Sequence, residues 1–254
     1  MSFWRPSKNC TYVISDINGM NNELELILSR ILPLRKTGGS IDKLIFLGNY
    51  ICGKSELVDL IIKEKTKCPD QIICLMGDND LRLLKSIDYF GPADATEYSK
   101  WLSSGGSQAL TGYLQRIKSD NTNPYLITRQ YLKRFIPQAH LDFISSLLPY
   151  YETEDYIFVH GGCDSNIPLD SQKIDVLVND RSIFNLVSKS GKCPWKKMMI
   201  TGGIGKLDGK PLIKDKFITL DGSYAERLYV LELNSRQIFS ARKGKSRLVQ
   251  ESIT

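Results

Sequence analysis

The segment Ile72-Ile73-Cys74-Leu75-Met76-Gly77-Asp78-Asn79-Asp80 runs from five consecutive apolar residues into a glycine and three polar side chains. A short continuous apolar run of this kind is typical of a strand buried on both faces. Residues 12–14 and 44–48 are similar runs, and they lead into Asp16 and Asn49. The polar positions follow at intervals of about 30 residues, the length of a β-α-β unit. Because apolar residues between the runs have helical spacing, the first third is predicted to be β-α-β-α-β.

The remainder of the chain predicts a second set of strands after a helical region. Residues 80–150 are predicted to form a helical insertion, interrupted by Gly105-Gly106 and by prolines. Apolar runs return further along, at residues 156–159, 198–201, 217–220, 227–233 and 237–240. The last three have no helical pattern between them, which indicates consecutive strands. We therefore expect an α/β fold with mixed sheets, in one domain over residues 1–254.

Composition excludes several classes of protein. The chain has 254 residues, with 34 Lys and Arg against 28 Asp and Glu, a formal net charge of +6. It contains no apolar run near the ~18–20 residues that cross a bilayer and no signal-peptide pattern, so we expect a cytoplasmic or otherwise intracellular protein. The six cysteines form no C-x-x-C pair, and two histidines exclude any site with three imidazoles. Basic residues gather in a predicted C-terminal tail, about 241–254.

Polar, metal-capable side chains follow several of the predicted strands. They are Asp16, Asn18, Asn49, Asp78, Asn79 and His160, with glycines beside them. In open α/β sheets, ligands bind just beyond the carboxyl ends of the strands. We expect these residues to share one rim.

Their order resembles the motifs of the calcineurin-like metallophosphoesterases, in particular the branch of bacteriophage-type serine/threonine phosphatases and symmetrical diadenosine tetraphosphatases. That family has G-D-x-H-G, G-D-x-x-D-R-G, G-N-H-[ED], H-[AG]-G and G-H-T on successive strand ends. Here the corresponding segments are residues 15–19, 48–54, 77–80, 160–162 and 201–203. Trp101 through Tyr113 is similar to the W…G-G…Y segment of the same branch. The resemblance spans about residues 12–233 and implies a four-layer β-sandwich flanked by helices.

Carried over residue by residue, the resemblance implies that most of the two-metal site has changed. Asp16 keeps a metal-ligand carboxylate and His160 keeps an imidazole ligand. Degenerate positions are Asn18 for a histidine ligand, Asn49 for the bridging carboxylate, Cys52 and Gly53 for Asp and Arg, Asn79 for the catalytic histidine, and Gly203 for the last histidine; Asp78 replaces an asparagine.

Ligand chemistry then predicts a weak or absent metal centre. The neutral amide of Asn49 cannot neutralise two dications, and Asn79 has no titratable nitrogen to act as an acid. One interpretation is a leftover hydrogen-bonded cluster without cofactor. The alternative is a residual site for a single Mg²⁺ or Mn²⁺ at Asp16, Asp78 and His160, with oxygen atoms of Asn18 and Asn49.

These observations favour a catalytically inactive phosphatase-like protein, a pseudophosphatase that acts as a binding or structural subunit with other proteins. The alternative is an active metal-dependent phosphoesterase, either a protein phosphatase or a nucleotide hydrolase, with an altered metal site. Nucleic-acid binding through the basic tail is a third possibility, and the small basic excess does not favour it.

Overall fold

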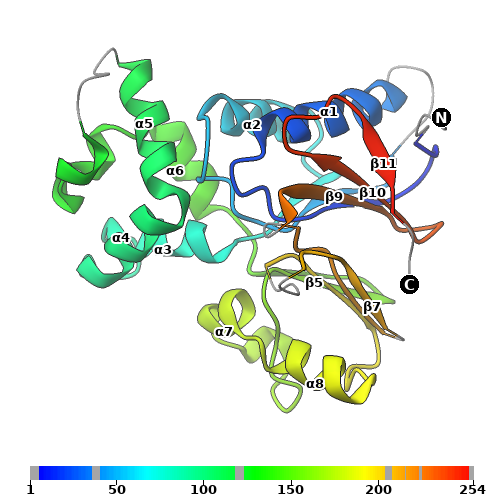
Figure 1. The fold of residues 1–254 in the computed structure, drawn as a ribbon. Coiled ribbons are helices and arrows are strands. Elements are labelled where there is room, and N and C mark those ends of the chain that lie inside the picture. The colour runs from blue at the N-terminus through cyan, green and yellow to red at the C-terminus, as the bar shows by residue number, and fades with distance from the viewer. Residues whose placement is uncertain are drawn as a thin grey trace.

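The computed structural model describes residues 6–35, 41–117, 123–203, 208–214, 216–222 and 225–251. Two mixed β-sheets lie face to face at its centre (Figure 1). The first sheet has the order β11-β10-β9-β1-β2-β3. Its strands are β1 (Tyr12–Ile14), β2 (Leu44–Phe46), β3 (Ile72–Cys74), β9 (Arg227–Glu232), β10 (Gln237–Arg242) and β11 (Leu248–Gln250). The β1, β2 and β3 strands are parallel and the others antiparallel, so the expected β-α-β-α-β unit is present.

The second sheet has the order β4-β5-β6-β8-β7. Its strands are β4 (Tyr150–Glu152), β5 (Tyr156–Val159), β6 (Met198–Thr201), β7 (Leu212–Lys214) and β8 (Phe217–Thr219). The central β5, β6 and β8 strands are parallel, while β4 and β7 are antiparallel edges. The chain crosses to the first sheet between β8 and β9, so the last three predicted strands do not share one sheet.

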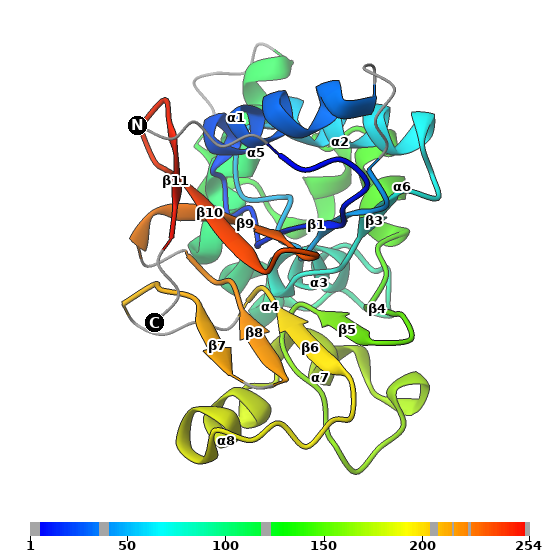
Figure 2. The same ribbon diagram turned by 90° about the vertical axis from the view of Figure 1, so that its right-hand side faces the viewer.

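Helices cover the outer face of each sheet, which gives four layers (Figures 1 and 2). The first sheet carries α1 (Asn21–Ile31) and α2 (Glu56–Lys67), and the second carries α7 (Ile174–Asn179) and α8 (Ser182–Ser190). Between the sheets lies an apolar core to which both contribute, including Val13, Leu231 and Phe158. The predicted α/β sandwich flanked by helices is confirmed.

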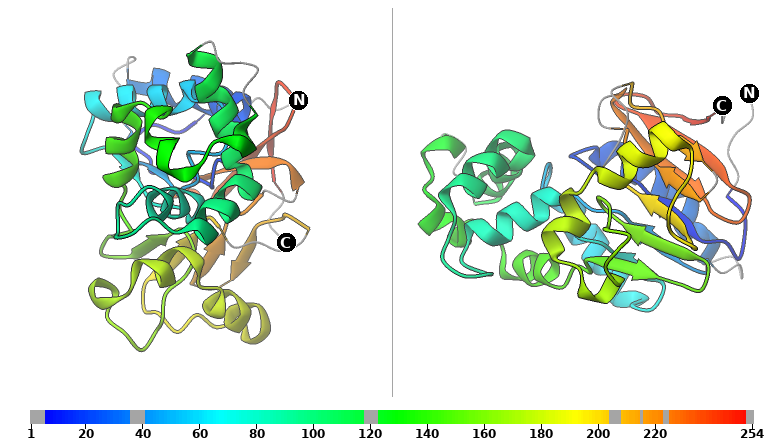
Figure 3. Two further views of the ribbon diagram at one scale, coloured as in Figure 1. Left: turned by 90° about the vertical axis from the view of Figure 1, so that its left-hand side faces the viewer. Right: turned by 90° about the horizontal axis from the view of Figure 1, so that it is seen from below.

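A helical part lies beside the sandwich (Figure 3). Its elements are α3 (Asp78–Ser86), α4 (Ala95–Trp101), the π-helix η2 (Leu102–Gly106), α5 (Ser107–Arg116) and α6 (Gln138–Ser145), with short 3₁₀ turns at Pro124–Leu126 and Arg129–Arg134. It occupies the span predicted as a helical insertion. His140 is fully buried there and bonds to the Tyr113 hydroxyl at 2.8 Å and to the Asp59 carboxylate at 2.8 Å. These bonds tie α6 to α5 and to α2.

Three edge strands were not expected, because their sequences lack a buried apolar run. They are β4, β7 and β11, and each has exposed or half-buried positions. The segment predicted as a basic tail is a hairpin of β10 and β11 as far as Gln250, while residues 252–254 lie outside the described part. Among the described residues no helix is both long and apolar enough to cross a membrane.

Candidate functional site

The loops that follow β1, β2 and β3 converge on one cavity of about 650 Å³. Asn18 and Asn49 adopt left-handed backbone conformations there, with φ of 44° and 62°. Asparagine tolerates this conformation better than most residues. The carboxyl ends of the first three strands thus turn toward the helical part, and α5 forms the opposite wall. The lining includes Asp16, Asn18, Asn49, Cys52, Gly53, Lys54, Asp78, Asn79, Arg82, Ser104, Gln108, Thr111, Gln115, Arg181, Gly203, Asp221 and Lys243.

Asp80 holds the β2–α2 loop in place from below the cavity. Its fully buried carboxylate accepts backbone N–H bonds from Asn49 (2.8 Å), Tyr50 (3.0 Å), Ile51 (3.4 Å) and Gly77 (2.9 Å). Burial raises the pKa of Asp80 to about 6, although the backbone bonds from Gly77 and Asn49 favour the charged form. The carboxylate is therefore a structural anchor for the loop that carries Asn49 and Cys52.

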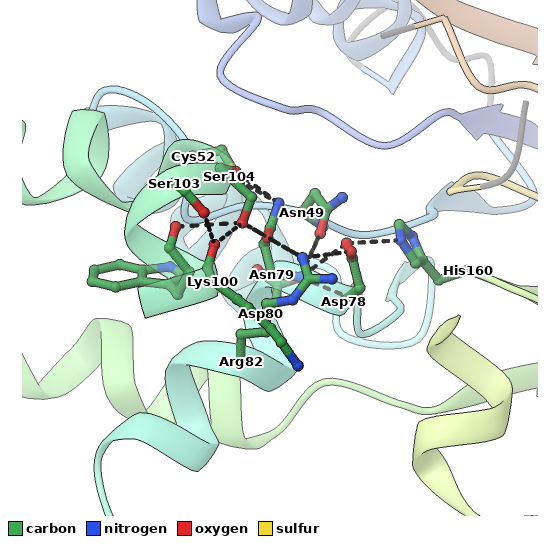
Figure 4. Close-up of polar contacts among 12 residues, drawn as sticks. Asn49, Cys52, Asp78, Asn79, Asp80, Arg82, Lys100, Ser103, Ser104 and His160 are labelled. Carbon is green, nitrogen blue, oxygen red and sulfur yellow. Dashed lines mark hydrogen bonds and ion pairs between the residues drawn. The ribbon is translucent and has the colours of Figure 1, made fainter. Parts of the chain in front are cut away.

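Asp78 lies between two cationic side chains (Figure 4). One carboxylate oxygen is 2.6 Å from Arg82 Nη1, and the other is 3.4 Å from His160 Nε2. Burial favours the neutral form of Asp78, but the hydrogen bond and charge of His160, followed by Arg82, hold its pKa well below the usual range. Asp78 is consequently an ionised and paired carboxylate.

His160 is buried, with a side chain only 1% exposed, and both ring nitrogens are engaged. Nδ1 is 2.6 Å from the Leu47 carbonyl oxygen, and Nε2 faces Asp78. Burial lowers the pKa of His160, but the hydrogen bond and charge of Asp78, together with the charge of Asp16, raise it to about 9. The raised pKa favours the imidazolium form, in which both ring nitrogens carry protons and neither has a lone pair for a metal.

Asn79 stands where the resemblance places a catalytic histidine, and all of its polar atoms are bonded (Figure 4). Its Nδ2 donates to the Ser104 carbonyl at 3.0 Å and to Cys52 Sγ at 3.3 Å. Its Oδ1 accepts from Arg82 Nη1 at 2.7 Å and from Ser104 Oγ at 2.5 Å. The residue therefore links the start of α3 to η2 and cannot transfer a proton.

Asp16 is the least satisfied group in the cavity. Its Oδ2 accepts from the side-chain amides of Asn18 and, at 3.5 Å, Asn49, while its buried Oδ1 has no hydrogen-bond partner among the described residues. Burial, and next the charge of Asp221, raise the pKa of Asp16 well above its usual value. A buried carboxylate oxygen without a partner is costly, and in native proteins it often marks a functional position.

The arrangement does not fit the metal centre that the fold implies. Within the described residues, no group of three or more His, Cys, Asp or Glu side chains is placed to hold a metal ion. Asn49 Oδ1 accepts the backbone N–H of Asn79 at 3.1 Å, and the amide nitrogen of Asn49 faces Asp16. Asn49 therefore turns its nitrogen, and not its oxygen, toward the position of a metal beside Asp16. Asp78 and His160 are paired with each other.

Gly203 contributes to this arrangement by lacking a side chain. A Cβ atom built there would lie 2.1 Å from His160 Nε2, closer than non-bonded atoms approach. The His160 ring thus occupies space that a side chain at position 203 would need. All the predicted site positions line this cavity or, like His160, contact its wall.

The sequence did not point to Arg82, Ser104 or Asp221 as members of the site. Arg82 lies four residues after Asp78 on one helix, a spacing that indicates an ion pair but usually an exposed one. Ser104 reaches the site through the π-helical turn at η2, where Gly105 has φ of 112°. Asp221 follows β8 in the second sheet, whereas Asp16 follows β1 in the first, so only the packing of the two sheets brings them to one cavity.

Comparison with solved structures shows the fold. One match, described as a "putative diadenosine tetraphosphatase", is 18% identical with a TM-score of 0.58 and covers 93% of this chain and 95% of its own. A hypothetical protein from Pyrococcus horikoshii OT3 is 15% identical with a TM-score of 0.51, covering 91% of this chain and 87% of its own. No family model and no curated protein matches the sequence. The chain has a calcineurin-like metallophosphoesterase fold.

Proposed function

We propose that this chain is a catalytically inactive member of the metallophosphoesterase fold that acts as a binding or structural subunit of a larger protein assembly. The observation that carries the proposal is the pairing of Asp78 with Arg82 and His160 at 2.6 and 3.4 Å. Two residues at metal-ligand positions, Asp78 and His160, are then engaged with each other, and Asp78 is also paired with Arg82. A two-metal hydrolase needs those carboxylate and imidazole atoms for its metals.

The surrounding residues support the loss of chemistry independently of the metal. Phosphoester hydrolysis needs a group that can donate a proton to the leaving oxygen, and Asn79 has none. Nor does Cys52 offer a substitute nucleophile, because burial raises the pKa of its thiol well above the usual value and so disfavours the reactive thiolate. Fold and activity are separable, so a cavity without these groups can be retained for binding.

The cavity itself supports a binding role. It keeps about 650 Å³ of volume and is lined by uncharged side chains of α5, namely Gln108, Thr111 and Gln115, which share one helix face. Lys54 and Arg181, which are exposed, also line the cavity. A cavity with many hydrogen-bonding groups, and an asparagine where the resemblance places the catalytic histidine, is suited to recognition.

The unpartnered Oδ1 atom of Asp16 favours the second candidate, an active phosphoesterase with an altered site. A single divalent cation bound by Asp16 would satisfy this oxygen. Such an enzyme needs one metal to activate water without the histidine ligands typical of the fold.

One preparation distinguishes the two candidates. We would measure hydrolysis of an aryl phosphate and of a dinucleoside polyphosphate with Mn²⁺ or Mg²⁺, with the Asp16→Ala variant as the matched background. The proposal expects the wild-type rate to equal that of the variant. Metal-dependent turnover that disappears in Asp16→Ala would establish the alternative.

The subunit role needs its own measurement. A tagged copy produced at its natural level would be isolated gently and its mass determined by light scattering. We expect a particle of defined composition that is heavier than the 28.8 kDa chain. A monodisperse 28.8 kDa monomer would contradict this part of the proposal.

A further inference from the structure

We propose that Arg82 takes the place of a metal ion at this site, and that its guanidinium actively excludes divalent cations from Asp78. The inference deepens the proposed function, since both hold that the metal chemistry has been lost. It adds a cause: the site is closed to metals by a built-in cation and does not merely lack ligands.

The guanidinium is held from several sides. Arg82 Nη1 lies 2.6 Å from Asp78 Oδ2 and 2.7 Å from Asn79 Oδ1, with Ser104 Oγ at 3.5 Å. Its side chain is 22% exposed, and that of Asp78 is 25% exposed. Partial burial of a charged pair with further hydrogen bonds fixes its geometry far better than a solvated surface pair.

Asn79 is essential to this position. A histidine there would present a ring nitrogen in place of the Oδ1 acceptor, which receives both Arg82 and Ser104. Asparagine in place of histidine at position 79 therefore removes the proton donor and supplies the oxygen that binds the guanidinium. One residue accounts for both changes.

The opposite side of Asp78 is closed by a matched pair of residues. His160 approaches with Nε2 at 3.4 Å while Nδ1 bonds to the Leu47 carbonyl. This ring position requires Gly203, because a Cβ at that position would lie 2.1 Å from Nε2. Both oxygens of Asp78 thus face nitrogen atoms of the chain itself, those of Arg82 and His160.

A dication at Asp78 would have to displace these groups or bind beside them. Removing the charge of Arg82 should therefore free one carboxylate oxygen next to Asp16, whose own Oδ1 is unpartnered. Two carboxylates with the amide oxygen of a rotated Asn49 form an oxygen-rich set of the kind that Mn²⁺ and Mg²⁺ accept. The proposal therefore predicts a gain of binding on mutation.

The test is calorimetric titration of the full chain with Mn²⁺, alongside unfolding temperatures with and without the metal. Arg82→Gln removes the charge and keeps one amide donor group on a shorter, still polar side chain. We expect it to bind Mn²⁺ about tenfold or more tightly than wild type, because a repelling cation close to the metal is gone. Adding Asp78→Asn to Arg82→Gln should abolish the gain.

The matched control is Arg116→Gln. Arg116, on α5, also pairs with a carboxylate at 2.8 Å, that of Asp59 on α2, and neither residue lines the cavity. It should leave Mn²⁺ binding unchanged. A folded Arg82→Gln protein that gains no affinity would overturn the proposal. The wild-type titration decides even if that variant does not fold, since stoichiometric Mn²⁺ uptake by wild type also overturns it.

These results separate the inference from the proposed function. Wild-type protein that binds Mn²⁺ without turnover refutes metal exclusion and leaves the inactive role standing. Wild-type protein that hydrolyses phosphoesters without taking up Mn²⁺ refutes the inactive role and leaves metal exclusion standing.

Discussion

Asp80 and Asp16 are two buried carboxylates on the same rim, and their surroundings differ sharply. Asp80 has 0% exposure and accepts four backbone N–H groups at 2.8 to 3.4 Å. Asp16 is 2% exposed and receives two side-chain amides on one oxygen, while its other oxygen has no partner among the described residues. One carboxylate is fully satisfied and the other is half satisfied beside a second acid, Asp221.

The difference separates the part of the rim that maintains the fold from the part that a ligand can still use. Residues that satisfy a loop's backbone must stay for the chain to fold. A buried carboxylate that lowers stability is expected only where it binds a ligand, which is the usual trade-off at functional sites. Substitutions at the two aspartates should therefore change stability in opposite directions.

The largest effect is expected for Asp80→Ala. The change removes the carboxylate that accepts from four backbone N–H groups, and burial leaves water little access to replace it. We expect a loss of about 4 kcal/mol in the free energy of unfolding, or no stable fold. Chemical denaturation provides the value. Asp170→Ala, at an exposed position, should change the free energy of unfolding by less than about 0.5 kcal/mol. A similarly small change for Asp80→Ala would contradict the structural role of Asp80.

A smaller loss, about 2 kcal/mol, is expected for Gly203→Ala, because the new methyl group must push the His160 ring from its place. Thermal or chemical unfolding measures it. The interaction is isolated by repeating the change in a His160→Ala background, where the space is open. An equal cost in both backgrounds would show that the glycine serves the backbone and not the ring.

Asp16→Asn is expected to stabilise the protein by about 1 kcal/mol at neutral pH. The amide removes a buried carboxylate whose pKa is raised by burial and by the charge of Asp221, and its oxygen can keep the bonds from Asn18 and Asn49. Asp80→Asn is the matched control, and it should destabilise because an NH₂ group then faces backbone N–H donors. We expect the urea midpoint of Asp16→Asn to lie above that of wild type and the midpoint of Asp80→Asn to lie below it. If both midpoints fall, the proposed difference between the two aspartates is wrong.

The parts of the molecule that sequence predicts well are those with local causes. Continuous apolar runs identified β1, β2, β3 and β5, since such runs are buried on both faces wherever they lie. The site positions followed, because the ends of parallel strands meet at one edge of a sheet. The exposed edge strands β4, β7 and β11 have no such run and were missed.

The chemistry of the rim depends on distances between distant segments. The contact between Gly203 and His160 exists because β5 and β6 are neighbours in the second sheet. The role of Arg82 depends on whether its side chain points to solvent or into the cavity, and helical spacing alone leaves both open. The orientation of Asn49, whose amide nitrogen faces Asp16, likewise arises from the Asn79 backbone N–H.

The smallest effect is expected for Asn79→His, which restores the histidine of the resemblance. We expect no turnover of an aryl phosphate above the Asp16→Ala background with Mn²⁺ present. A proton donor adds rate only where a nucleophile is already activated, and the positions that would hold the metals for it remain Asn49 and Gly203. Unfolding temperature serves as the control, since the variant must be folded for the rate to count. Turnover from this single change would mean that the metal site is intact and that only the acid is missing. Asp16 would then be a functioning metal ligand.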